Sequence, residues 1–105
     1  MIPLPEKYRK NSYEFSLVER TGDVAIYEQR EPLNNRVIGY EVFEVQKQEE
    51  GEAFGRPVVA KELTPGNEQW GYLGFTCVSL GAAKGKAQMM IHRQNERGSK
   101  ISPEV

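Results

Sequence analysis

Two segments and one histidine contain the residue types that catalysis or ligand binding would need. The segment GAAKGK (81–86) has the glycines and lysine of a phosphate-binding loop, but three residues separate its glycines where that loop has four, and Ala87 follows the lysine where it has Ser or Thr. His92 has no Ser, Cys or second His near it in sequence. The carboxylates of QKQEEGE (46–52) are paired only by adjacency, which is typical of a solvated turn. We therefore predict that the protein is not an enzyme and has no cofactor and no metal site.

Composition and length limit the remaining classes of protein to which the chain could belong. The chain has 105 residues, of which 38% are hydrophobic and 28% charged, as expected for a single soluble domain. No apolar run approaches the ~18–20 residues of a transmembrane helix, and the first residues have no apolar signal-peptide core. The single cysteine, Cys77, lies in an apolar segment and is predicted to be a small core residue. A lone cysteine fits a reducing compartment, so we expect a cytoplasmic protein.

The only tryptophan lies in the stretch TPGNEQWG (64–71), which has the signals of a short helical turn. Thr64 is a suitable N-cap, Pro65 suits the first helical position, and Gly71 can end the turn in a left-handed conformation. We predict that Trp70 packs between the sheet and a C-terminal helix. The alternative is that Trp70 is exposed and contacts a partner.

The elements that would position these residues follow from two periodicities. Apolar residues alternate in 13–17, and VAIYEQR (24–30) is the predicted return strand after a turn at Gly22. The third strand, 37–47, has apolar groups on both faces, and a fourth, edge strand is expected in 56–63. From Ser79, an N-cap, apolar residues recur at helical spacing to about residue 94, and Gly81 and Gly85 are expected to approach the sheet closely.

These elements predict an α+β fold. It consists of an antiparallel three- to four-stranded meander sheet, a one-turn helix, and a C-terminal amphipathic helix packed on one face. Residues 13–94 are predicted to form the domain, with flexible segments at 1–12 and 95–105. Because one helix covers only one face of the third strand, we expect a homodimer or a partner protein on the other face.

Charge is segregated along the chain. Residues 13–78 contain six basic and twelve acidic side chains, a net of −6, whereas both ends are basic. We predict a small non-catalytic interaction protein that binds a host or partner protein through an acidic sheet side, where it could act as an inhibitor by mimicking nucleic acid. The residues predicted to bind the partner are Tyr40, Glu41, Phe43, Glu44 and Trp70. The alternative is single-stranded nucleic-acid binding, for which the predicted residues are Tyr27, Lys84, Lys86 and Arg93.

Two resemblances to known families bear on these hypotheses. The stretches VAIYEQR, GYEVFEV and PGNEQWGYLGFT, followed by a basic helix, resemble a group of small bacteriophage and mobile-element proteins that has no established activity. The triplet Glu68, Gln69 and Trp70 resembles the EQW near the helix start of the single-strand-binding transcriptional coactivators. That second resemblance implies antiparallel strands followed by one helix, and binding of single-stranded nucleic acid.

Overall fold

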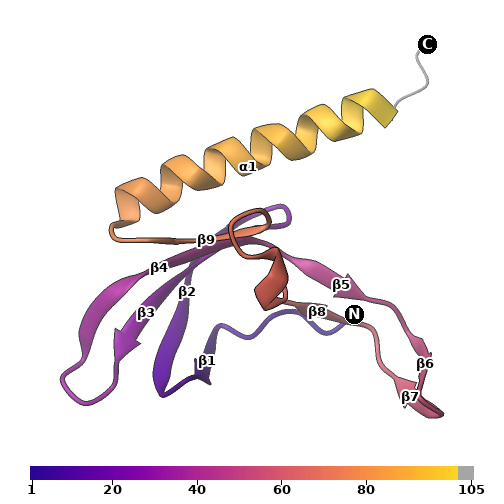
Figure 1. Cartoon of the computed structure of the whole chain (residues 1–105), viewed down its shortest axis with the longest axis horizontal. Coiled ribbons are helices and arrows are strands. Elements are labelled where there is room, and N and C mark those ends of the chain that lie inside the picture. Colours follow the sequence, from indigo (N-terminus) through magenta and orange to yellow (C-terminus); the bar gives the residue numbers. More distant parts are fainter. Residues whose placement is uncertain (102–105) are drawn as a thin grey trace.

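The protein folds as one antiparallel sheet with a long helix across it (Figure 1). The structure is a computed structural model that describes residues 1–101, apart from the side chains of Ala53, Asn67 and 97–101. The sheet has five strands in the order β1-β2-β3-β4-β9. Their bounds are β1 (Lys7–Lys10), β2 (Tyr13–Thr21), β3 (Val24–Glu31), β4 (Arg36–Glu44) and β9 (Gly74–Cys77). The helix α1 spans Leu80–Ile101, and the predicted α+β class is confirmed. The sheet contains the three predicted meander strands and two strands that were not predicted, β1 and β9.

Tight turns make the first four strands a meander. The β1–β2 turn places Asn11 and Ser12 at φ of 53° and 68°, a left-handed pair that suits a two-residue hairpin. The β2–β3 turn contains Gly22 at φ 59°, as the sequence predicted. One extra residue, Val18, bulges from β2 between the pairs Leu17–Tyr27 and Glu19–Ile26.

The helix closes one face of the sheet with small and aliphatic side chains. Ser79 caps α1 as predicted, because its Oγ accepts a hydrogen bond of 3.1 Å from the Ala82 N–H. The core on this face consists of Val24, Ile26, Val42, Cys77, Ala83, Ala87 and Met90. The expectation that Gly81 and Gly85 approach the sheet is wrong, since a Cβ on either would meet nothing within 4 Å.

The other face is covered by the chain's own N-terminal segment. Its buried residues are Phe15, Ala25, Tyr27, Phe43 and Val45, and Leu4, Tyr8 and Trp70 pack against them. Strand β1 pairs with β2 from Lys7 to Lys10. Residues 1–12 therefore lie inside the domain, contrary to the predicted boundary at residue 13. Phe43 on β4 is 0% exposed and packs against Tyr27 and Trp70, so the second face of β4 is covered within the chain and the reason for expecting a homodimer does not hold.

Trp70 lies on the face away from α1, which corrects its predicted place between sheet and helix. The helical turn before it is a 3₁₀ helix, η1 (Asn67–Gln69), and Gly71 has the predicted left-handed φ of 92°. The turn is closed by Gln69, whose Oε1 accepts a hydrogen bond of 2.8 Å from the Gly66 N–H. Gly74 lies directly under the indole, where a Cβ would be 2.3 Å from the ring.

Between β4 and η1 the chain forms a hairpin arm, residues 46–63, that projects from the sheet on the side away from α1 (Figure 1). Two short ladders build it, one near the sheet and one at the tip. The first joins β5 (Gln46–Gln48) to β8 (Lys61–Leu63), and the second joins β6 (Gly51–Ala53) to β7 (Arg56–Val58). The single edge strand predicted for 56–63 is thus two short strands of this arm.

Candidate functional site

A hollow of about 330 Å³ opens on the sheet face away from α1. We call it the aromatic hollow, and its lining residues are Lys10, Asn11, Tyr13, Phe15, Gln29, Glu41 and Trp70. The β1–β2 hairpin, β3, β4 and the segment after η1 each contribute to it. Side chains two residues apart on a strand share a face, so Tyr13 and Phe15 reach the same hollow.

Aromatic rings pack against one another in a row on this face. Tyr8 stacks on Phe15 with 4.9 Å between ring centroids, and Tyr27 stacks on Phe43 at 5.5 Å. Phe43 in turn meets Trp70 at 6.4 Å. The indole Nε1 of Trp70 donates a hydrogen bond of 3.1 Å to the Thr76 Oγ1 on β9, so the ring is held at both its edge and its face.

Glu41 is the acidic group of the hollow. It is half-buried on β4, and among the described residues no donor or cation lies within bonding distance of its carboxylate. Burial raises the pKa of Glu41 above its ordinary value, and the nearby Lys10 only partly opposes this effect. Ionisation of Glu41 therefore costs stability, because no group among the described residues donates a hydrogen bond to its carboxylate.

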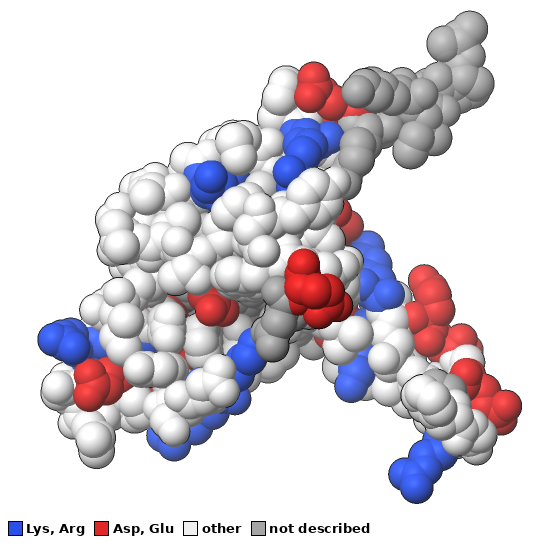
Figure 2. All heavy atoms as spheres, viewed as in Figure 1, with Lys and Arg blue, Asp and Glu red and all other residues white. Residues whose placement is uncertain are grey.

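The hairpin arm presents a second candidate surface. Phe54 at its tip is 104% exposed and has a φ of 53°, and Gly55 follows at 76°. Glu49, Glu50 and Glu52 are also exposed on the arm, and in the described part of the chain they form no ion pair. Figure 2 shows acidic side chains along the arm and a basic group at its end.

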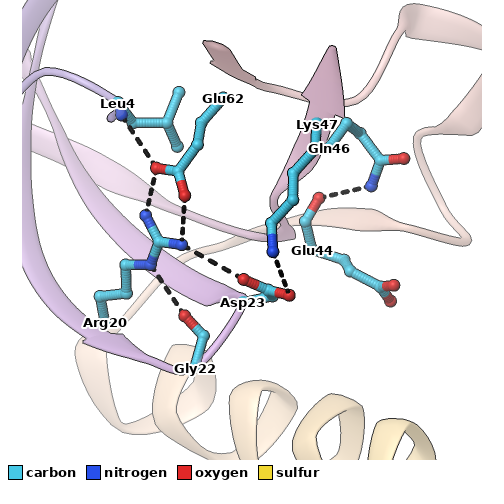
Figure 3. A network of polar contacts seen from close by, with 8 residues as sticks. All are labelled: Leu4, Arg20, Gly22, Asp23, Glu44, Gln46, Lys47 and Glu62. Atoms are coloured by element: carbon cyan, nitrogen blue, oxygen red, sulfur yellow. Dashed lines mark hydrogen bonds and ion pairs between the residues drawn. The ribbon is translucent and has the colours of Figure 1, made fainter. Parts of the chain in front are cut away.

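A network of charged groups fixes the root of the arm to the sheet (Figure 3). Arg20 on β2 donates two hydrogen bonds to Glu62 on β8, at 2.5 and 2.7 Å, and a third to Asp23 at 3.3 Å. Glu62 also accepts a hydrogen bond of 3.1 Å from the Leu4 N–H. The Arg20 guanidinium lowers the pKa of Glu62 to about 2. Lys47 on β5 completes the network with an ion pair of 3.3 Å to Asp23.

The predicted partner-binding residues do not form one surface. Phe43 is 0% exposed, so it cannot contact a partner, which corrects its predicted role. Tyr40 packs on the α1 side, and Glu44 faces the same side because it pairs with Val24. Only Glu41 and Trp70 come together, in the aromatic hollow.

The sheet is less acidic than the count for residues 13–78 suggested, because β1 belongs to the sheet and adds Lys7, Arg9 and Lys10 to it. Three of the sheet's carboxylates also form ion pairs within the sheet or at its edges. These pairs are Arg9–Glu14 at 2.8 Å, Arg30–Glu28 at 2.6 Å and Arg36–Glu31 at 3.5 Å. Among the described residues, Glu49, Glu50 and Glu52 on the arm form no ion pair, and Glu19 and Glu41 on the sheet form none either.

The residues predicted for nucleic-acid binding are divided by the sheet. Tyr27 is 0% exposed on the face away from α1, and its hydroxyl donates a hydrogen bond of 2.7 Å to the Pro5 carbonyl, so it cannot stack on a base. Lys84 is exposed on α1. Lys86 lies 4.4 Å from the centre of the Phe75 ring, and Arg93 lies 5.0 Å from that of Tyr72. Lys84, Lys86 and Arg93 therefore all lie on α1, whereas Tyr27 lies on the opposite face of the sheet.

Sequence reasoning missed the arm and most of the hollow. The signal for the arm was limited to Gly55, which tolerates the positive φ of a two-residue hairpin turn, whereas Phe54 is not a typical residue of such a turn. The hollow had no local signal, because Tyr13, Gln29 and Glu41 meet only through the register of three strands.

Comparisons with known proteins found no relative of this chain. No family model, curated protein or solved structure matches the chain. Across residues 1–101, no three His, Cys, Asp or Glu residues gather as metal ligands would, and the described helices include none long and apolar enough to cross a membrane.

Proposed function

We propose that this is a non-catalytic protein that binds a partner protein through its hairpin arm. The observation that carries the proposal is Phe54, which is 104% exposed at the tip of an element that projects from the domain. Aromatic side chains at protruding positions are frequent anchors of protein interfaces, where they fill a pocket on the partner.

The conformation of the tip supports this role. A bulky residue at positive φ is unfavourable in a turn that Asn or Gly would fit without strain, and Phe54 has a φ of 53°. Its exposed ring also forgoes the ~1.5–3 kcal/mol that burial of such a side chain contributes. Neither cost is offset within the described chain. An unfavourable residue that remains at an exposed tip is a reason to infer a function there.

The charges around Phe54 indicate the kind of partner. Glu49, Glu50 and Glu52 are exposed and unpaired among the described residues, with Arg56 as the opposing charge on the tip ladder. This acidic setting favours a partner that has an apolar pocket within a basic surface. Basic surfaces often bind nucleic acid, so occupation of one by the arm would inhibit that binding. The bacteriophage origin that the resemblance implies, and a cytoplasmic location, remain predictions.

The test is affinity capture with matched variants of the full chain. Tagged wild type, Phe54→Ser and Leu33→Ser are each incubated with a nuclease-treated bacterial lysate. Leu33 is the control because it is also an exposed apolar turn residue, at 95%, but lies in the β3–β4 turn. We expect wild type and Leu33→Ser to capture the same protein and Phe54→Ser to lose it. Equal capture by Phe54→Ser, or no specific capture by wild type, would contradict the proposal.

Single-stranded nucleic-acid binding is the second candidate. It is favoured by one observation, the placement of Lys86 and Arg93 over Phe75 and Tyr72 beside the edge strand β9. A salt series with a labelled oligonucleotide tests it, because neutralised phosphates make the logarithm of the binding constant fall linearly with that of the salt concentration. Lys84→Gln and Lys86→Gln should then each reduce the slope.

A further inference from the structure

We propose that the aromatic hollow is a binding site for the guanidinium group of an arginine side chain supplied by another polypeptide. The site is distinct from the arm, and the inference does not rest on the proposed function. It rests on Glu41, on the two aromatic walls and on the size of the hollow.

The carboxylate of Glu41 provides the charge. It is half-buried at the hollow, and among the described residues it forms no hydrogen bond and no ion pair within 4 Å. A guanidinium carries five N–H donors in a planar fork, and it can engage both oxygens of one carboxylate. A bound guanidinium would therefore donate the hydrogen bonds that the Glu41 carboxylate lacks among the described residues.

The aromatic walls select a cation with flat faces. Trp70 and Tyr13 line the same hollow as Glu41, and the Trp70 ring is fixed by its hydrogen bond of 3.1 Å to Thr76 and by Gly74 beneath it. Guanidinium groups stack on such rings and gain cation–π attraction, which is strongest for tryptophan. Gln29 also lines the hollow, and a glutamine side chain can accept a hydrogen bond through its amide oxygen.

The dimensions limit the ligand to one side chain. A volume of about 330 Å³ lies at the low end for ligand pockets, so the hollow suits a single arginine rather than a larger cofactor. Lys10 is the chain's own cation at this site. It lies outside ion-pair distance of Glu41 and is exposed, so it competes with a ligand cation without filling the hollow.

Trp70 provides the measurement, because it is the only tryptophan in the chain and forms a wall of the site. The full-length protein is titrated at constant ionic strength with the peptide acetyl-Gly-Arg-Gly-amide while tryptophan fluorescence is recorded. A parallel titration uses the same peptide with citrulline, which has nearly the same shape and no charge. We expect a saturable change with the arginine peptide and at least a ~10-fold weaker response with citrulline, about 1.4 kcal/mol.

Three variants make the test specific. Glu41→Gln keeps the shape of the side chain and should weaken arginine binding by at least ~10-fold, whereas Glu19→Gln, an exposed residue on β2, should leave it unchanged. Lys10→Met should tighten binding because it removes the competing cation. Thermal melting of each variant shows that its fold is retained. Equal binding of the two peptides, an unsaturable response, or equal binding by Glu41→Gln would overturn the proposal, and so would weaker binding by Lys10→Met.

Discussion

The two faces of the sheet are built by the same strands but are covered in different ways. The α1 face is closed by small and aliphatic residues of one regular helix, which pack close to the strands. The opposite face is closed by a short N-terminal segment and by Trp70, over a row of aromatic rings. Irregular covering leaves space at its edges, and the aromatic hollow is such a space. This difference supports the proposal that binding takes place on the irregular face, while the regular face serves stability.

The largest change in the free energy of unfolding is expected for the row of aromatic rings on the irregular face. Phe43→Ala removes a ring that is 0% exposed and stacked on Tyr27, so it should lower the free energy of unfolding by ~3–5 kcal/mol. Urea denaturation measures this change. If Phe43 were instead a partner contact, the unfolding midpoint would stay close to that of the wild type.

The next effect concerns the position of Trp70. Gly74→Ala places a methyl group about where the indole lies, since the Cβ would be 2.3 Å from the ring. Such overpacking should cost ~1–3 kcal/mol and shift tryptophan fluorescence to longer wavelength as the ring is displaced. Gly85→Ala is the matched control, because nothing lies within 4 Å of its Cβ, and it should stabilise α1 by up to ~1 kcal/mol. An unchanged emission spectrum in Gly74→Ala would show that Trp70 is not seated on Gly74.

Loss of the charged network at the arm's root should have an intermediate effect. Glu62→Gln breaks a two-pronged, partly buried pair with Arg20 and should cost about 2 kcal/mol at pH 7. The pKa of Glu62 is lowered from 4.5 to about 2, so its contribution is present above pH 4.5 and is lost as the pH falls toward 2. Wild type and Glu62→Gln should therefore converge in urea stability at low pH. A difference that persists at pH 2 would contradict this assignment.

The smallest change in the free energy of unfolding is expected for Glu41→Gln, and this substitution should stabilise the protein where the others destabilise it. Burial raises the pKa of Glu41, so the folded state holds the proton more tightly than the unfolded chain does. Its stabilising effect is complete below the ordinary pKa and is lost as the pH rises through the raised value. Glu41→Gln should thus be slightly more stable than wild type at pH 7, and this advantage should shrink in acid. A destabilised Glu41→Gln would mean that the carboxylate has a structural partner.

Local patterns were sufficient for the regular elements. The structure contains the strand predicted from alternation in 13–17, the turn at Gly22, the return strand after it and the cap at Ser79. The helical spacing predicted α1, but α1 continues to Ile101, past the predicted end near residue 94 and into the tail predicted to be flexible. Alternation also grouped side chains by face. It did not indicate which face α1 would cover, and for that reason Trp70 was assigned to the wrong side.

The irregular face depends on contacts between residues far apart in the chain. Tyr8 pairs with Phe15 through a strand of only four residues, and a polar N-terminal sequence gave no sign of it. The arm is built from strands of three residues, which are too short to show a period. Glu41 and Trp70 were both predicted as contact residues. That they line one hollow together with Tyr13 follows only from the pairing register of β2, β3 and β4.

Amide hydrogen exchange of the protein alone and bound to its captured partner is the most direct test that binding occurs away from α1. We predict that the partner slows exchange in residues 49–58 of the arm, because the tip is buried in the complex, and leaves the first turns of α1 unchanged. Protection confined to α1 and β9, with exchange in the arm unaltered, would contradict the account and place the interface on the helix side.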